Sequence, residues 1–258
     1  MTNQYLSVVI PVFNDQEVLN ELYKRLKPVL DKISNKYEIV FIDDGSKDNS
    51  FQRLKSLQEK DKSIKIIKLS RNFGQSNAIS AGLDHSEGEI IIIMDSDLQD
   101  RPEDIPELIN SLNQNNASMS IAKWIYKEDS KLKKFASNIF FKISNKITCI
   151  HHSSKLGVFR VIRKEVLDKI KELPQQKGST LSLMYWAGFD YVTVGLKRGQ
   201  RYAGKSGYNL KKLLILAFER ILSYSLLTSK INKRKKIKPK YAIDEFLCIN
   251  RRDAKTQG

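Results

Sequence analysis

The chain has 258 residues, of which 41% are hydrophobic, and its 45 Lys and Arg outnumber its 29 Asp and Glu, for a formal net charge of +16. This composition supports a sizeable core and excludes a disordered chain, while the positive charge indicates an anionic partner such as a phosphorylated substrate or an acidic membrane. The two cysteines, Cys149 and Cys248, exclude a zinc cluster or a disulfide framework and fit a reducing cytoplasm.

The first half of the chain alternates short apolar runs with helical patterns. Strands are predicted at 6–13, 37–42, 64–69, 89–94 and 117–124, and helices at 15–33, 50–59, 76–86 and 102–112. Asp48 and Ser50 are candidate N-caps of the second helix, and Pro102 stands where the first turn of a helix tolerates proline. Continuous apolar strands that alternate with helices predict a Rossmann-like α/β fold, with a mostly parallel sheet covered on both faces.

The pattern loosens after residue 125, but no linker or internal repeat interrupts it. Helices are predicted at 131–147, at 165–173 and before Trp186, and strands at 156–162 and 190–198. We therefore expect a single domain over residues 1–228, whose second half supplies the variable wall of a site. A basic tail is expected over residues 229–258.

The C-terminal region combines an apolar helical pattern with a basic run. Residues 213–227 are apolar at helical spacing but are interrupted by Glu219 and Arg220, and no run reaches the roughly 18 to 20 apolar residues that span a bilayer. This helix can pack on the core, which is the simpler interpretation, or lie in a membrane interface. Seven basic residues within 230–240 then form either a solvated tail or a grip on anionic lipid.

No signal peptide is expected, because the N-terminal apolar run follows no basic region and breaks at Pro11. The predicted location is the cytoplasm, with a peripheral position on the cytoplasmic face of a membrane as the alternative.

Polar residues follow three of the predicted strands at the point where each strand ends. They are PVFND (11–15), DDGS (43–46) and DSDLQD (95–100). Ligands of open parallel sheets bind outside the carboxyl ends of the strands, so these residues are expected to converge on one edge. A single acid there can simply cap the next helix, which is the simpler role of Asp48, but three clusters favour a binding site.

The third of these clusters has the chemistry of a metal site. Asp95, Asp97 and Gln99 alternate, so in an extended stretch their side chains would point the same way. Carboxylates packed this closely raise each other's pKa unless a cation neutralises them. Their oxygens suit Mg²⁺ or Mn²⁺, which use one or two carboxylates and complete their shell with substrate phosphates. We therefore predict a divalent metal that holds a diphosphate.

Three segments carry a family resemblance: SVVIPVFND (7–15), VFIDDGSKDNS (40–50) and LSRNFGQSNAISAGLDHSEGEIIIIMDSDLQDRPE (69–103). In this order and spacing they resemble the family 2 glycosyltransferases, in particular the branch of dolichyl-phosphate mannose synthase and bactoprenol glucosyltransferase. The resemblance covers about residues 6–225. It implies a GT-A fold, a nucleotide-diphosphate sugar donor and an inverting transfer. The two C-terminal membrane helices of the bactoprenol enzymes are not expected in this chain.

The resemblance also implies roles for individual residues. The metal and donor ligands would be Asp95, Asp97 and Gln99. The base and ribose would be surrounded by Pro11, Phe13, Asp15 and Asp44, with Arg71 near the donor. Asp100 has the family's position for a catalytic residue, although it could also begin the next helix beside Pro102.

A basic segment of the second half resembles the same branch. In RGQRYAGKSGYNLKKLL (198–214), the residues that would close over the diphosphate or meet an acceptor phosphate are Arg198, Arg201, Ser206 and Tyr208. Arg201, supported by Arg198 and Lys205, would stabilise the charge that builds on the leaving group. Residues 199–206 also spell a P-loop, but too little chain follows for such a domain. A phosphate-gripping loop is the better interpretation.

The acceptor side departs from the family pattern. Lys155 stands where the resemblance places an aspartate, and residues 175–183 lack the arginines often found there. Family members also more often carry Tyr and Glu at the positions of Phe13 and Asp15. These departures weaken the assignment of the acceptor more than the assignment of the reaction type.

We therefore predict a metal-dependent glycosyltransferase that moves a sugar from a nucleotide-diphosphate donor to a saccharide acceptor, lipid-linked or free, in cell-surface polysaccharide assembly. The absence of a predicted membrane span and the altered acceptor wall favour this acceptor. Two alternatives stay open, a polyprenyl-phosphate glycosyltransferase and a catalytically silent nucleotide-sugar-binding protein. A homo-oligomer is compatible with the sequence. Nucleic acid is not an expected partner, because the basic residues are spread along the chain without a recognised module.

A lipid-linked acceptor would require the helix at 210–228 and the basic run to hold the enzyme at an anionic surface. Each Lys or Arg near such a surface contributes about 1 kcal/mol, screened by salt. We expect reversible binding to anionic vesicles in a flotation assay, falling steeply with ionic strength, and none to neutral vesicles. Removal of residues 230–258 should abolish it. If the intact protein does not bind anionic vesicles at low salt, the helix packs on the core.

Overall fold

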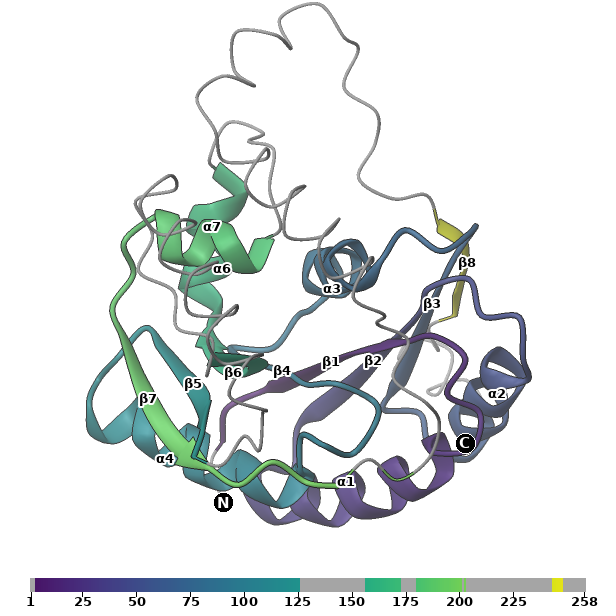
Figure 1. Ribbon diagram of the computed structural model, residues 1–258, viewed down its shortest axis with the longest axis horizontal. Helices are drawn as coiled ribbons and strands as arrows, with labels where there is room; N and C mark the ends of the chain where they lie inside the picture. Colours follow the sequence, from purple (N-terminus) through teal and green to yellow (C-terminus); the bar gives the residue numbers. More distant parts are fainter. Residues whose placement is uncertain (1–2, 126–155, 173–179, 201, 203–242, 248–258) are drawn as a thin grey trace, which may run out of the picture.

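The computed structural model describes residues 3–125, 156–172, 180–200, 202 and 243–247. The strands are β1 (Leu6–Val12), β2 (Tyr37–Asp43), β3 (Ile64–Leu69), β4 (Ile90–Ile93), β5 (Met119–Trp124), β6 (Leu156–Arg163), β7 (Tyr191–Leu196) and β8 (Ile243–Leu247). The helices are α1 (Leu19–Ile33), α2 (Ser50–Lys60), α3 (Gln75–Asp84), α4 (Ile105–Gln114), α6 (Lys164–Glu172) and α7 (Thr180–Trp186), with a 3-10 turn η1 (Pro102–Asp104) before α4. Together they form a three-layer α/β fold (Figure 1).

One sheet carries all the described strands, in the order β7-β5-β6-β4-β1-β2-β3-β8. The pairing is parallel through the centre, where β1 lies between β2 and β4 and where β2 pairs with β3. β5 and β7 are also parallel, while β6 is antiparallel to its neighbours β4 and β5 and β8 is antiparallel to β3. The prediction of a mostly parallel sheet is confirmed.

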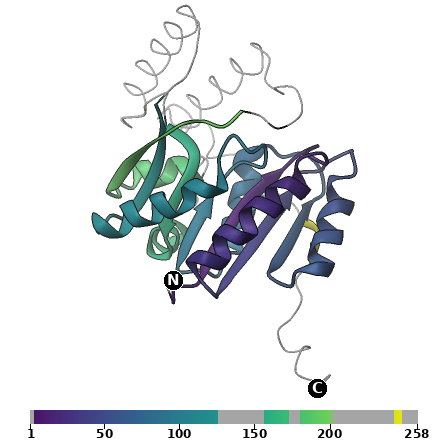
Figure 2. The same cartoon turned by 90° about the horizontal axis from the view of Figure 1, so that it is seen from below.

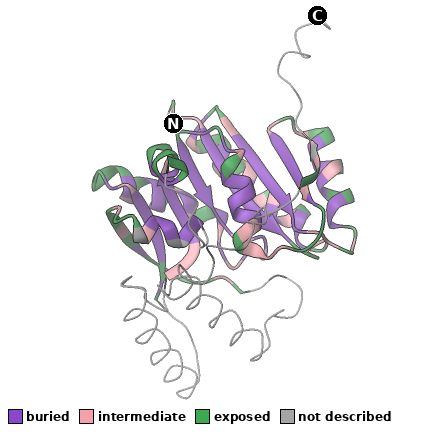
Figure 3. Cartoon of the chain, turned by 90° about the horizontal axis from the view of Figure 1, so that it is seen from above, coloured by how far each residue is buried: buried purple, intermediate pink, exposed green. Residues whose placement is uncertain are grey.

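Helices cover both faces because successive residues of the central strands enter two different clusters of buried side chains. Val8 and Ile10 belong to the cluster shared with α1, α2 and α4, and Val9 belongs to the cluster shared with α3, α6 and α7. Figures 1 and 2 show these two groups of helices on opposite faces of the sheet. In Figure 3 the strands are buried, and exposed residues lie mainly on the outer sides of helices and in loops. Burial on both faces explains why the strands appear in the sequence as continuous apolar runs.

Most predicted elements are present, with shifted ends. The first helix begins at Leu19 rather than at 15, because the intervening residues form a loop at the edge of the sheet. The helix predicted at 102–112 is the turn η1 followed by α4. The helices predicted at 131–147 and 213–227 and the basic run at 230–240 lie outside the described residues. Within the described segments, none of the helices is long and apolar enough to cross a membrane.

The N-cap of α2 is Asn49, which makes no side-chain cap hydrogen bond, so neither Asp48 nor Ser50 is the N-cap that the sequence predicted. Asp48 Oδ1 accepts a hydrogen bond from the backbone N–H of Ser50 at 3.0 Å, at the first residue of the helix. The prediction for Ser50 was wrong, because its hydroxyl accepts the N–H of Asp15 at 2.9 Å and so ties the end of β1 to the start of α2.

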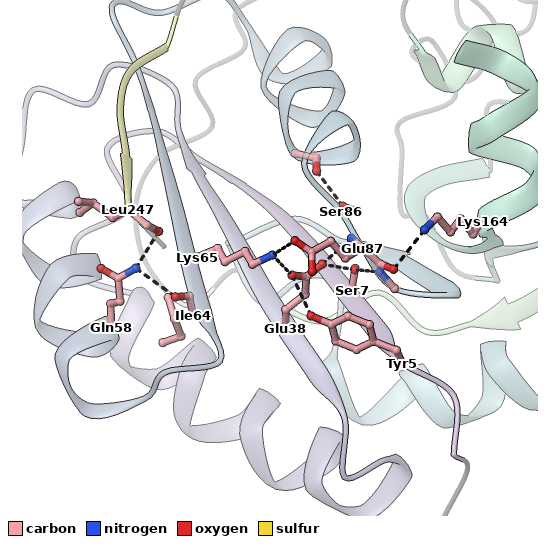
Figure 4. A network of polar contacts seen from close by, with 12 residues as sticks. Tyr5, Ser7, Glu38, Gln58, Ile64, Lys65, Ser86, Glu87, Lys164 and Leu247 are labelled. Atoms are coloured by element: carbon pink, nitrogen blue, oxygen red, sulfur yellow. Dashed lines mark hydrogen bonds and ion pairs between the residues drawn. The ribbon is translucent and has the colours of Figure 1, made fainter. Parts of the chain in front are cut away.

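The strand β8 was not predicted, and it lies within the segment expected to be a basic tail. It pairs with β3 at the edge of the sheet, where Asp244 contacts Lys68 and Glu245 contacts Lys55. The side-chain amide of Gln58 donates to the carbonyl oxygens of Ile64 and Leu247 at 3.1 and 2.8 Å, which joins α2 to β3 and to the edge strand β8 (Figure 4). Deleting residues 230–258 would therefore remove a strand as well as the basic run. Substitution of the seven basic residues of 230–240 is the cleaner test of membrane binding.

A charge network around the buried pair Lys65 and Glu38 lies at the amino-terminal edge of the sheet (Figure 4). Lys65 of β3 is 2.6 Å from a carboxylate oxygen of Glu38 in β2 and 2.7 Å from one of Glu87. Glu38 also accepts hydrogen bonds from the Ser7 hydroxyl and from the N–H of Glu87, and Ser7 accepts the N–H of Gly88. Burial alone would lower the pKa of Lys65, but its hydrogen bonds with the two glutamates raise it. The network fixes the loop between α3 and β4 to the sheet.

We expect Lys65→Met to lower the free energy of unfolding by about 3 to 5 kcal/mol, because it leaves the buried Glu38 carboxylate without its cation. Urea unfolding measures the change. The matched control is Lys55→Met, which breaks a more exposed pair and should cost less than about 1 kcal/mol. Equal losses for the two variants would contradict a stabilising role of the network.

Candidate active site

The carboxyl ends of β1 and β2 are joined by hydrogen bonds between their loops. The backbone N–H of Asn14 donates to the Ser46 hydroxyl at 3.0 Å, and the N–H of Lys47 donates to the Asn14 side-chain oxygen at 2.8 Å. Asn14 has a positive φ of 55°, a conformation that asparagine tolerates better than most residues. The polar residues after these two strands therefore converge on one edge, as the sequence predicted.

The acidic segment after β4 forms a tight turn, so the expectation of an extended stretch was wrong. Leu98 has a φ of 62°, and the N–H of Gln99 donates to Asp97 Oδ1 at 3.0 Å. Burial still alternates along the turn. Asp95, Asp97 and Gln99 are half-buried, whereas Ser96, Leu98 and Asp100 are buried. The three predicted ligands thus share accessibility without sharing an extended backbone.

Asp100 stabilises this turn through a hydrogen bond to the turn's own backbone. Its Oδ2 accepts the backbone N–H of Asp95 at 2.8 Å, and the side chain is buried. Burial and the neighbouring Asp95 carboxylate raise the pKa of Asp100 well above its usual value. The hydrogen bond makes Asp100 a residue that holds the turn, and its predicted catalytic role stays a prediction.

Asp15 connects the loop after β1 to the acidic turn. Its carboxylate accepts hydrogen bonds from the Ser96 hydroxyl at 2.5 Å and from the N–H of Phe13 at 3.3 Å. Burial raises the pKa of Asp15, against the lowering effect of the bond from Ser96. Two predicted site residues, Asp15 and Asp97, are close enough for their charges to interact.

The charges of the turn favour a bound cation. Burial, the nearby carboxylate of Asp97 and, less strongly, that of Asp15 raise the pKa of Asp95 to about 7, although Arg198 opposes the shift. A divalent cation would allow these carboxylates to stay ionised together, and their oxygens suit Mg²⁺ or Mn²⁺. Within the described ranges, no group of three or more His, Cys, Asp or Glu could hold a metal by itself. The residues present fit a metal that takes one or two carboxylates and completes its shell with phosphate oxygens.

The loop between β3 and α3 is held by Asp44. Its two carboxylate oxygens accept the backbone N–H groups of Phe73 and Gly74 at 2.7 and 2.9 Å. The same loop carries Arg71, whose guanidinium lies 4.4 Å from the centroid of the Phe73 ring. The structure therefore gives Asp44 a positioning role that the sequence did not suggest. Its predicted contact with the base or ribose stays a prediction.

The end of β7 and the residues after it lie against the acidic turn. The N–H of Gly199 donates to the carbonyl oxygen of Gln99 at 2.9 Å, and the N–H of Tyr202 donates to that of Asp97 at 3.4 Å. A side chain at position 199 would collide with the carbonyl oxygen of Leu98, at 2.6 Å. Arg198 lies over the ring of Trp124, 5.6 Å from its centroid. The other basic candidates of this segment, Arg201 and Lys205, lie outside the described residues with Ser206 and Tyr208.

Two apolar candidates on the strand β1 side differ in accessibility. Phe13 is 43% exposed at the edge of the sheet, where an aromatic ring could stack on a base. Pro11 is buried within β1. Trp124 is 5% exposed and belongs to the core.

Sequence reasoning missed two residues that contact the predicted acids. Ser96 donates to Asp15, and the side-chain amide of Gln75 donates to Asp95 Oδ1 at 2.5 Å. The available signal for Gln75 was its position after β3, because the third strand of a parallel sheet ends at the same edge as the others. Ser96 offered no signal beyond its place between two aspartates.

The model of glycosyl transferase family 2 matches residues 7–171. The chain belongs to this family. An uncharacterized glycosyltransferase of Bacillus subtilis (strain 168) is 36% identical over 219 residues, covering 85% of this chain and 68% of the relative. The bactoprenol glucosyl transferase of Shigella phage SfV is 37% identical over 221 residues, covering 85% and 72%. An undecaprenyl-phosphate 4-deoxy-4-formamido-L-arabinose transferase of Shewanella sediminis is 32% identical over 222 residues, covering 85% and 66%.

Solved glycosyltransferase structures share the fold. A mannosyltransferase of Pyrobaculum calidifontis in complex with GDP-Man and Mn²⁺ has a TM-score of 0.59 at 18% identity, covering 93% of this chain and 67% of that one. The glucosyl-3-phosphoglycerate synthase of Mycobacterium tuberculosis, in complex with Mn²⁺, UDP-glucose and phosphoglyceric acid, has a TM-score of 0.60 at 16% identity, covering 90% and 82%. The predicted GT-A fold of this glycosyltransferase is confirmed.

We expect Asp44→Ala to weaken the binding of a nucleoside diphosphate by about 1.5 to 3 kcal/mol, the usual effect of losing a charged hydrogen-bond partner. Calorimetry with UDP and GDP measures it. Hydrogen exchange at the amides of Phe73 and Gly74 separates the two roles, because only the positioning role requires faster exchange in the variant. Unchanged affinity would refute the contact with the base or ribose, and unchanged exchange would refute the positioning role.

Proposed function

We propose that this glycosyltransferase moves a sugar from a nucleotide-diphosphate donor to a polyprenyl phosphate, in a metal-dependent, inverting reaction at a membrane surface. The observation that carries the donor half is the acidic turn 95–100, which presents Asp95 and Asp97 at the carboxyl edge of the sheet beside Arg198. The acceptor half is supported by the two relatives named for bactoprenol and undecaprenyl phosphate.

The donor diphosphate would be bound by charge from two sides. Asp95 and Asp97, with Gln99 beside them, would hold Mg²⁺ or Mn²⁺, and the bound metal would neutralise the leaving diphosphate. The complexes of two structural neighbours with Mn²⁺ and a nucleotide sugar support this choice of metal. On the other side, Arg198 and the sequence-predicted Arg201 would counter the charge that develops on the leaving group.

The choice of acceptor reverses the order of preference drawn from the sequence, which favoured a saccharide. Two relatives have names that favour a lipid phosphate. They are 37% and 32% identical to this chain, over 85% of its length. The net charge of +16 suits a phosphorylated acceptor and an anionic membrane.

A phosphate acceptor also simplifies the chemistry. One anionic oxygen of the acceptor phosphate attacks the anomeric carbon of the sugar, and the bond from that carbon to the β-phosphate oxygen breaks. The electron pair leaves with the nucleoside diphosphate, and a single displacement inverts the anomeric configuration. A phosphate monoester has its second pKa at about 6, so it is already anionic at pH 7 and needs no general base.

A saccharide acceptor remains the second candidate, on the observation that Lys155 replaces the aspartate expected before the Phe159–Arg160 pair. A sugar hydroxyl would need a general base within hydrogen-bond reach.

The test is a transfer assay with purified protein, Mn²⁺ or Mg²⁺, and UDP- and GDP-sugars. Undecaprenyl phosphate in detergent and a set of oligosaccharides are offered as separate acceptors. We expect a lipid-phosphate sugar, identified by mass spectrometry. Asp97→Ala and excess chelator should each abolish its formation, while circular dichroism shows that the variant is folded. Transfer to oligosaccharide alone would overturn the acceptor, and full activity of Asp97→Ala would overturn the metal site.

A further inference from the structure

Gln75 joins the third strand's loop to the acidic turn. It is the first residue of α3, and its side-chain Nε2 donates a hydrogen bond of 2.5 Å to Asp95 Oδ1. The two residues lie on separate elements. The bond therefore connects a side chain of α3 to Asp95, a half-buried acid of the turn 95–100.

The backbone on both sides of this bond is fixed. Before Gln75, the Asp44 carboxylate binds the N–H groups of Phe73 and Gly74, and the Asn77 side chain donates to the Phe73 carbonyl oxygen at 2.8 Å. After Asp95, the Asp100 carboxylate binds the Asp95 N–H at 2.8 Å. A side chain held this firmly at its base and at its partner costs little conformational entropy to orient.

The bond has a consequence for the Asp95 carboxylate. Carboxylates that bind metal are themselves oriented by hydrogen bonds from residues outside the ligand set. A neutral amide donor orients the carboxylate of Asp95 without adding a positive charge that would compete with a metal. It also stabilises the ionised form next to the carboxylates of Asp97 and Asp15.

We propose that Gln75 is a positioning residue for the sugar donor, and that its amide holds the Asp95 carboxylate in the orientation that binds the metal and the donor diphosphate. This inference rests on the proposed function of the same site. Asp44 takes part indirectly, by holding the backbone from which Gln75 reaches across.

Two variants separate a hydrogen bond from simple packing. Gln75→Met keeps the length of the side chain without a donor, and Gln75→Glu keeps its shape but replaces the donor by an acceptor. Calorimetry with UDP and with GDP in the presence of Mn²⁺, together with the electron paramagnetic resonance spectrum of the bound Mn²⁺, follows binding without turnover. We expect both variants to raise the dissociation constant about 10- to 100-fold, the usual effect of removing a residue that orients a metal ligand. In the transfer assay, KM for the donor should rise more than kcat falls.

Gln58→Met is the matched control, because Gln58 is a buried glutamine whose amide bonds only backbone oxygens of β3 and β8 among its described partners. The Gln58 variant should have a lower melting temperature and unchanged Mn²⁺-nucleotide binding. The Gln75 variants should keep the wild-type melting temperature and bind the nucleotide more weakly. Wild-type affinity in both Gln75 variants, or a loss of affinity that only accompanies an equal loss of melting temperature, would overturn the positioning role. If the wild-type protein binds neither nucleotide with Mn²⁺, the proposed function itself fails, and the positioning role with it.

Discussion

β1 is hydrogen-bonded in parallel to β2 on one side and to β4 on the other, and the candidate active site depends on that arrangement. Parallel neighbours end at the same edge, so residues that are about 30 and 80 positions apart in the chain meet there, as the bonds of Asn14 with Ser46 and of Asp15 with Ser96 record. The strands themselves are fixed by aliphatic side chains buried on both faces, which leaves the polar loops at their ends as the part of the sheet free to vary in chemistry. The core thus sets where the site lies, and the loops set what it binds.

The acids at this edge divide into two kinds. Asp44 and Asp100 are buried, and their carboxylates accept backbone N–H groups and hold loops in place, while Asp95 and Asp97 are half-buried, although Asp97 also accepts the N–H of Gln99. Backbone N–H groups stabilise a carboxylate without bringing a full positive charge. This lets the chain collect carboxylates within a small volume, although the protein as a whole is strongly basic.

Much of this arrangement could be predicted from the sequence, because aliphatic runs such as Ile90–Ile93 determine both the strand and its burial. The convergence of the strand ends followed from the parallel topology alone. Details that depend on loop paths could not be predicted: the positive φ of Leu98 turns the 95–99 segment away from an extended course, and the reach of Gln75 to Asp95 depends on how Asp44 holds the preceding backbone. β8 escaped prediction for a different reason. Five residues carry little periodicity, and their partner strand lies far away in the sequence.

That distance has a consequence for how the protein is made. Gln58 of α2 and Leu247 of β8, which are hydrogen-bonded beside the β3–β8 pair, are 189 residues apart in the chain. At the usual rate of synthesis of about 5 to 20 residues per second, roughly 10 to 40 s pass between the appearance of one and of the other. During that interval β3 is an open edge whose backbone groups can pair with another nascent chain. Lys65 and Lys68, which the finished protein uses in ion pairs with Glu38, Glu87 and Asp244, place positive charge on this edge from the moment it emerges from the ribosome. The same lysines can therefore discourage self-association on polysomes before they stabilise the folded sheet.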